Sequence, residues 1–239
     1  MAIAVGASVA RWAGSVSQGS SITSASFTPA DGSLLVLCIN MDKFASSSML
    51  TVVFTVTGGS LVWTQRVIQQ PSATVAGPVA AIWTAPVVTG ASMTVSVSQT
   101  GDPDGGRLSA KLYIVTGQHA LPIGATGSGT SATNNITPTA YTSTADNSRG
   151  FGSATDFNAL GTPASTDTED AAHYSGEISV LSLFKAADTP TSGTGVTMNF
   201  DASGTGAADW GWCALEILPD AAPAVGPVLF RPINTLIRR

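Results

Sequence analysis

Ser33–Ile39 reads SLLVLCI, a continuous apolar run in a chain of 239 residues. A short apolar run bounded by turn residues is typical of a β-strand that is buried on both faces. The segment before it, Thr28–Gly32 (TPADG), holds the proline and glycine that a tight turn uses. We therefore expect a central strand of a packed sheet at this point.

Similar runs recur on both sides of this strand, with glycine and proline between them. Lys and Glu, which favour helices, each occur only three times, whereas Val, Thr and aromatic residues are frequent. This pattern predicts an all-β antiparallel sandwich or jelly roll of about a dozen strands. The predicted strands are Ser21–Phe27, Ser33–Ile39, Leu50–Val56, Leu61–Val67, Pro78–Thr84, Ser92–Ser98, Leu108–Val115, Asn135–Tyr141, Ser148–Phe157, Gly176–Lys185, Gly195–Phe200 and Asp209–Leu218.

The chain contains a weak internal repeat. Ile22–Ser33 (ITSASFTPADGS) resembles Ile136–Ser148 (ITPTAYTSTADNS), and Met93–Val115 resembles Val196–Leu218. Both pairs occur in the same order, which indicates a duplication.

We accordingly divide the body, residues 1–218, into two related halves, Ser20–Gly117 and Asn134–Leu218. They could form the two halves of one sandwich or two tandem small sandwiches. We favour one sandwich, because the second half has few predicted strands with which to close a core alone. The stretch Gly124–Asn134, rich in Gly, Ser and Thr, is predicted to be a flexible connector.

The composition restricts the class of protein. Charged residues make up 10% of the chain, against about 25% in an average protein. The net charge of −5 argues against a nucleic-acid partner. No apolar run is long enough for a membrane span, and no signal peptide is recognisable at the start, so we expect synthesis in a cytoplasm and no membrane partner. We expect Cys38 and Cys213 to be buried free thiols, with a disulfide open only if their strands are neighbours.

The segment after the body differs from it in character. Residues 219–227 form a linker rich in Pro and Ala, and Val228–Arg239 (VLFRPINTLIRR) follows. Residues 1–220 hold 7 basic and 15 acidic residues, a charge of −8, whereas this basic apolar tail holds three arginines and no acid. Such a peptide is suited to docking on a partner. Its expected contacts are Leu229, Phe230, Arg231, Ile233, Leu236, Ile237, Arg238 and Arg239.

Patterns for catalysis or metal binding are sparse. His119 and His173 stand alone, and no Cys or His spacing predicts zinc. The acids Asp102 and Asp104, and the group Asp167, Glu169 and Asp170, are expected in solvated loops. We therefore predict no enzyme, no catalytic residue, no cofactor and no metal.

The tryptophans are the remaining candidates for binding. Trp63 and Trp83 fall in predicted strands, and Trp210 and Trp212 share one face of a strand. Exposed rings would provide a platform on which glycans stack, whereas buried rings would fill the core.

Several stretches together resemble virion proteins of tailed bacteriophages, especially those that infect actinobacteria. They are ITSASFTPADGSLLVLCIN, GGSLVWTQRV, AAIWTAPVVTGASMTVSVS and GVTMNFDASGTGAADWGWCALEI, within Ser20–Leu218, and a Phe-Arg-Pro tail such as Phe230–Pro232. Proteins of this group are described as minor tail or head decoration (accessory) proteins. The resemblance implies a β-sandwich displayed on a particle and implies no catalytic residue.

These observations lead to two expectations of function. The first is a structural virion protein, a head decoration or tail accessory subunit, that docks on a major capsid or tail protein through its tail and associates with itself as a trimer or ring. The alternative is a carbohydrate-binding module for host adhesion, displayed on the particle.

Overall fold

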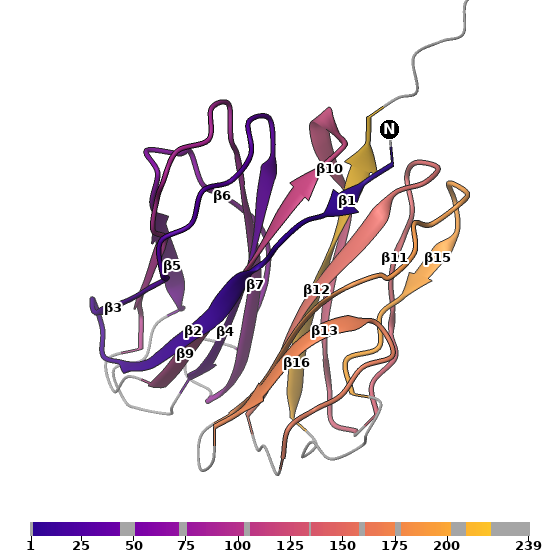
Figure 1. The fold of residues 1–239 in the computed structure, drawn as a ribbon. Helices are drawn as coiled ribbons and strands as arrows, with labels where there is room; N and C mark the ends of the chain where they lie inside the picture. Colours follow the sequence, from indigo (N-terminus) through magenta and orange to yellow (C-terminus); the bar gives the residue numbers. More distant parts are fainter. Residues whose placement is uncertain are drawn as a thin grey trace, which may run out of the picture.

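The computed structural model describes residues 2–43, 51–71, 76–102, 106–133, 135–157, 161–174, 178–201 and 209–220. Within these residues the chain forms sixteen strands in antiparallel sheets and no helix. The predicted all-β sandwich body is therefore confirmed (Figure 1). The basic apolar tail, together with linker residues 221–227, lies outside the described residues.

The first half of the chain forms one large and one small sheet. The large sheet has the order β1-β9-β4-β7-β6, with β2 also pairing with β9, and the small sheet has the order β3-β8-β5. The strands are β1 Ala4–Val5, β2 Val9–Val16, β3 Ser21–Thr23, β4 Leu34–Lys43, β5 Val53–Thr57, β6 Thr64–Gln69, β7 Gly77–Pro86, β8 Ser96–Thr100 and β9 Gly106–Thr116.

The second half repeats this plan. Its large sheet has the order β10-β16-β12-β14-β13, and its small sheet pairs β11 with β15. The strands are β10 Gln118–Ser131, β11 Thr139–Thr142, β12 Arg149–Asp156, β13 Thr168–His173, β14 Ser179–Phe184, β15 Gly195–Thr197 and β16 Trp210–Pro219.

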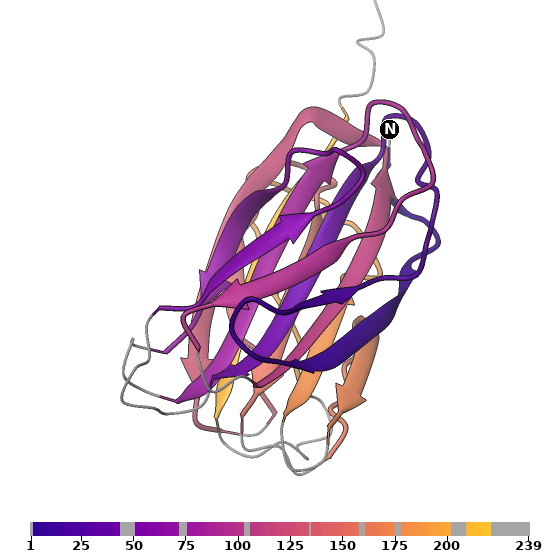
Figure 2. The ribbon, with the colours of Figure 1, turned by 90° about the vertical axis from the view of Figure 1, so that its left-hand side faces the viewer.

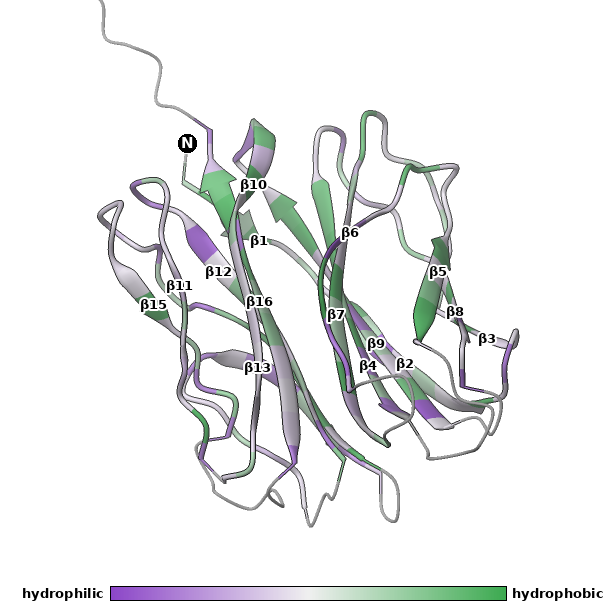
Figure 3. Ribbon diagram, turned by 180° about the vertical axis from the view of Figure 1, so that it is seen from behind, coloured by the Kyte–Doolittle hydropathy of each residue, from purple (hydrophilic) through white to green (hydrophobic). Residues whose placement is uncertain are grey.

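The sheets stack as four layers, with the two large sheets in the middle (Figures 1 and 2). In the central pair, β4 lies opposite β12, and β7 lies opposite β16. Figure 3 shows hydrophobic residues along β7 and β16, where the large sheets face each other. Three apolar cores result: an outer core within each half and an inner core between the halves.

Strand β4 explains why SLLVLCI is apolar at every position. Leu35, Leu37 and Ile39 pack into the outer core of the first half, whereas Leu34, Val36 and Cys38 pack into the inner core. Successive side chains point to opposite faces of a sheet, so a strand between two cores needs apolar residues on both. The predicted doubly buried strand is confirmed.

Residues that correspond in the internal repeat make corresponding backbone pairs in the two halves. Phe27 pairs with Met93 in the first half, and Tyr141, its counterpart in the repeat, pairs with Val196. Likewise, the Ser24 N–H donates to the Val95 carbonyl at 2.9 Å, and the Met198 N–H donates to the Pro138 carbonyl at 3.1 Å.

The turn before the central strand is repeated too. The Gly90 N–H donates to the Asp31 carboxylate at 2.6 Å, and the Ser192 N–H donates to the Asp146 carboxylate at 2.7 Å. The sequence similarity thus marks equivalent backbone positions in the two halves.

The repeat left open whether the halves form one sandwich or two tandem sandwiches, and the four-layer stack combines both arrangements. Each half has its own pair of sheets, and the large sheets of both halves also pack together as a central sandwich. We expected the second half to have too few strands for a core alone. Two strands that we did not predict, β10 and β13, complete its large sheet.

The prediction of a flexible connector at Gly124–Asn134 is wrong, because most of this stretch belongs to β10, which pairs with β16. Its glycines allow close packing rather than flexibility. A side chain at Gly127 would lie 1.7 Å from the Ala140 carbonyl oxygen, and one at Gly129 would lie 2.8 Å from the Trp212 ring.

Candidate functional site

The predicted docking residues of the tail, Leu229, Phe230, Arg231, Ile233, Leu236, Ile237, Arg238 and Arg239, lie outside the described residues. The structure does show where the body ends. Strand β16 ends at Pro219, beside Gln118 of β10, and the Asp220 N–H donates to the Gly117 carbonyl at 2.8 Å. Asp220, the last described residue, therefore lies at the end of the body that also carries the N-terminal strand β1 (Figure 1).

The candidate tryptophans Trp210 and Trp212 are buried in the outer core of the second half. Trp212 stacks on Phe200 with 5.7 Å between the ring centroids, and Gly129 lies against its indole ring. Trp212 also lines an open hollow of about 320 Å³, but it is only 9% exposed. A sugar stacks on a free ring face, so these two residues do not form an exposed stacking platform.

Trp63 and Trp83 are half-buried and pack against the outer core of the first half. The Trp63 Nε1–H donates to the Gly58 carbonyl at 3.3 Å. Any glycan-stacking surface made by the four candidates would therefore be limited to the exposed parts of these two rings.

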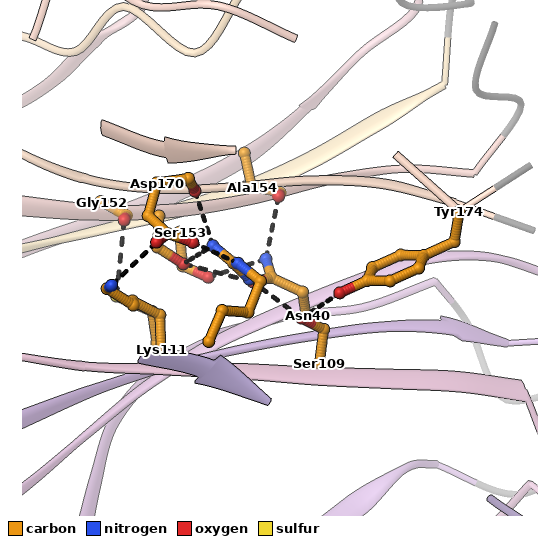
Figure 4. A network of polar contacts seen from close by, with 11 residues as sticks. Asn40, Ser109, Lys111, Gly152, Ser153, Ala154, Asp170 and Tyr174 are labelled. Atoms are coloured by element: carbon orange, nitrogen blue, oxygen red, sulfur yellow. Dashed lines mark hydrogen bonds and ion pairs between the residues drawn. The ribbon is translucent and has the colours of Figure 1, made fainter. Parts of the chain in front are cut away.

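A network of polar side chains lies between the two large sheets (Figure 4). Arg11 of β2 crosses to the second half, where its guanidinium donates to the Asp170 carboxylate, to the Asp170 carbonyl at 2.6 Å and to the Ser182 hydroxyl at 2.9 Å. Lys111 of β9 donates to the other oxygen of Asp170 at 2.8 Å. One carboxylate of the second half thus pairs with two cations of the first.

Asn40 of β4 extends the same network. Its side-chain amide donates to the Ala154 carbonyl at 2.8 Å and to the Ser153 hydroxyl at 3.0 Å, while its oxygen accepts from Arg11 at 3.3 Å. At the border of the cluster, Arg107 lies 4.3 Å above the ring of Tyr174. Polar groups from both halves satisfy one another here, as burial requires.

The charges of this network are mutually dependent. Burial opposes the charged form of Asp170, but Arg11 and Lys111 outweigh it and hold the pKa of this carboxyl below its usual value. Neighbouring Glu169 has a raised pKa, chiefly because partial burial disfavours its charge. The side chains of Arg11 and Lys111 are only 8% and 7% exposed, so Asp170 is the anion that makes their burial possible.

The prediction that Asp167, Glu169 and Asp170 lie in a solvated loop is wrong in two ways. Glu169 and Asp170 lie in β13, although Glu169 is exposed. Asp167 lies just before that strand, but its side chain is only 6% exposed and pairs with Lys185 at 2.6 Å. Arg11 and Asp170 are 159 residues apart in sequence, so no local pattern could have joined them.

A chemical role for the other polar groups finds little support in their geometry. His173 Nδ1 lies 3.0 Å from the Ser179 hydroxyl, but that hydroxyl is buried and donates its proton to the Gly161 carbonyl. It therefore does not present its proton to the imidazole, as a serine nucleophile would. His119 accepts from the Leu121 N–H at 3.0 Å.

Among the described residues, no three His, Cys, Asp or Glu side chains gather closely enough to hold an ion. Asp104 lies outside the described residues, and Asp102 is buried, where its carbonyl accepts from Gln99 at 3.0 Å. Within the same part of the chain, no helix is long and apolar enough to cross a membrane.

The expectation of buried free thiols is confirmed for Cys38 and Cys213. Both lie in the inner core, on strands of the two facing sheets. Burial raises the pKa of the Cys38 thiol to about 12, and burial together with the nearness of Cys38 raises the pKa of Cys213. Both thiols are therefore protonated and unreactive at neutral pH.

Comparison with known proteins adds no relative. No family model matches the chain, no curated protein is significantly similar in sequence, and no solved structure matches the fold.

Proposed function

We propose that this chain is a structural virion protein of a tailed bacteriophage, a head decoration or tail accessory subunit that docks on a major virion protein through its C-terminal tail. The proposal includes no chemical step. The observation that carries it is the contrast between a body with three closed apolar cores and a tail of twelve residues that holds six large apolar side chains and three arginines.

The tail supports docking for a physical reason. Large apolar residues are costly to keep in water, so a segment that carries six of them is expected to bury them on a partner. The arginines would pair with carboxylates of that partner in bidentate geometry.

The body supports a structural role. Its halves are joined by an inner apolar core and by the network around Arg11 and Asp170, so the four layers form one stiff unit. Charged residues are few, which suits a module packed against copies of itself as a trimer or ring. The resemblance of Ser20–Leu218 to phage virion proteins points in the same direction.

Deletion of Pro227–Arg239 tests the anchor. We expect the shortened chain to fold with unchanged thermal unfolding and to be missing from particles. A chain of full length in which Val228–Arg239 is scrambled is the matched control, since it keeps length and charge. Full incorporation of the deleted chain into particles would disprove the anchoring role.

The glycan-binding alternative is carried only by Trp63 and Trp83, whose side chains are partly exposed. If it holds, replacing both residues by Ala abolishes binding to a glycan array that the wild-type chain recognises. A wild-type chain that binds no glycan on the array removes this alternative.

A further inference from the structure

The exposed apolar side chains of the body are unevenly distributed. Four large hydrophobic residues of the described chain stand out: Val62, Val88, Leu121 and Val53, which are 78%, 85%, 77% and 55% exposed. The first three lie at one end of the stack, and Val53 lies toward the other. We call Val62, Val88 and Leu121 the apolar end.

Strand register places the apolar end. Leu34 pairs with both Pro86 and Val115, so the end of β7 is level with the end of β9, and Val88 lies two residues beyond. Val62 and Val88 line the same open hollow of about 380 Å³, together with Leu61 and Pro86.

Leu121 belongs to the same end of the second half. It lies between Gln118, which pairs with Pro219, and Ile123, which pairs with Ile217. The apolar end is therefore the end of the body that carries Asp220, the last described residue before the linker. Val53, by contrast, pairs with Thr100, after which the chain turns to enter β9 at the opposite end of the sheet.

The length of the linker limits where the tail can bind. Seven residues lie between Asp220 and Val228, so eight residue-to-residue steps join them. A fully extended chain spans about 3.5 Å per step, or about 28 Å here. Strand β9 alone has 11 residues, which corresponds to about 36 Å. The first residue of the tail, Val228, can therefore lie no farther from Asp220 than about 28 Å, which is less than the length of β9. A partner that binds the tail from Val228 onward would accordingly lie near the apolar end.

We propose that the apolar end seats on the same partner protein that binds the tail, so that Val62, Val88 and Leu121 contact an apolar patch of that protein beside the tail site. This inference rests on the proposed function. The short linker, residues 221–227, would hold the partner next to these side chains. Their burial would then add to the apolar contact that the tail makes. The hollow between Val62 and Val88 would accept an apolar side chain of the partner.

The test uses particles purified from a phage that lacks this gene, to which the purified full-length chain is added back. Val62→Lys, Val88→Lys and Leu121→Lys are compared with Val53→Lys, a matched change of an exposed valine at the other end. We expect each of the three substitutions to weaken attachment about tenfold, because burial of one aliphatic side chain contributes roughly that much. The control should attach like wild type.

Thermal unfolding of each variant verifies that it folds, as expected for such exposed positions. Wild-type attachment of all three variants would overturn the inference, and so would equal weakening by Val53→Lys. A fall in self-association, measured by sedimentation, with attachment unchanged would assign the apolar end to a contact between copies and also overturn it. Attachment of the chain that lacks Pro227–Arg239 would instead overturn the proposed function, so the two failures are distinguishable.

Discussion

The two halves of the molecule share one strand order but fill their outer cores differently. The first half closes with a three-stranded small sheet over mainly aliphatic residues, such as Leu37 and Leu112. The second closes with only two strands, over Tyr141, Phe200, Trp210 and Trp212. The two halves thus share strand pairing and turns but fill their outer cores with different side chains. A core therefore tolerates substitution when its volume is filled.

Removal of a central core side chain from either half should have the largest effect. We expect Trp210→Ala to lower the free energy of unfolding by about 4 kcal/mol and Leu37→Ala by about 3 kcal/mol, because both leave cavities. Denaturant unfolding measures both changes. The inner core joins the halves, so each variant should unfold in one transition. Two separate transitions would show that the halves are independent.

Substitution in the polar network that joins the two halves should destabilise the fold almost as much. Asp170→Asn leaves Arg11 and Lys111 buried without an anion, and we expect a loss of about 3 kcal/mol. Asp31→Asn, at an exposed turn where the amide oxygen can still accept from Gly90, should cost less than about 0.5 kcal/mol. Equal effects of the two substitutions on urea unfolding would contradict a central role for the network.

Acid should remove the difference in the free energy of unfolding between the wild-type chain and Asp170→Asn. The pKa of Asp170 is lower in the folded chain than its ordinary value, so the stabilisation is complete above about pH 4 and is lost as the pH falls through the folded value. Unfolding free energies measured from pH 7 to pH 2 should therefore converge only below about pH 4. Convergence that is already complete at pH 6 would contradict the assignment.

Substitutions in the turn that both halves share should have smaller effects on stability. Gly90 and Ser192 hold the same position in the two halves, but a side chain at Gly90 would lie 2.0 Å from the Pro29 carbonyl oxygen. We expect Gly90→Ala to cost about 1–3 kcal/mol, as a steric clash typically does. Ser192→Ala should be nearly neutral. A neutral Gly90→Ala in thermal unfolding would mean that the first turn is less tightly packed.

The smallest effect is expected at the residue that follows the turn's aspartate in each half. Gly32 and Asn147 both adopt a left-handed backbone, with φ of 69° and 56°. Asn tolerates this conformation better than other residues with a side chain, so Gly32→Asn should change stability by less than about 0.5 kcal/mol. Gly32→Val is the contrasting variant, since a β-branched residue is strained there; equal melting temperatures for the two would contradict the shared turn.

Much of the fold could be predicted from the sequence, because the apolar runs and turn residues that define each strand are local patterns. Each predicted strand overlaps an observed one, and the repeat located equivalent pairs such as Phe27–Met93 and Tyr141–Val196. The missed strands are β1, β2, β10 and β13. Strand β10 is rich in Gly and Ser, and β13 reads TEDAAH, so neither shows the apolar alternation of a half-buried strand.

The candidate site was much less predictable. The pairing of Arg11 and Lys111 with Asp170 depends on how the two large sheets stack, and no spacing within either half encodes that contact. The apolar end is likewise a product of register, since Val62, Val88 and Leu121 come from three separate segments of the chain. The tail was recognisable from composition alone because its apolar and basic residues are consecutive.

An electron cryo-microscopy map of a tailed-phage particle is the decisive test of the proposed function. We expect the body to stand on a major capsid or tail protein with the end that carries Val88 and Asp220 toward that protein, and density for Val228–Arg239 to continue into it. A particle without the chain, or a body attached by its opposite end with the tail in solvent, would disprove the proposal.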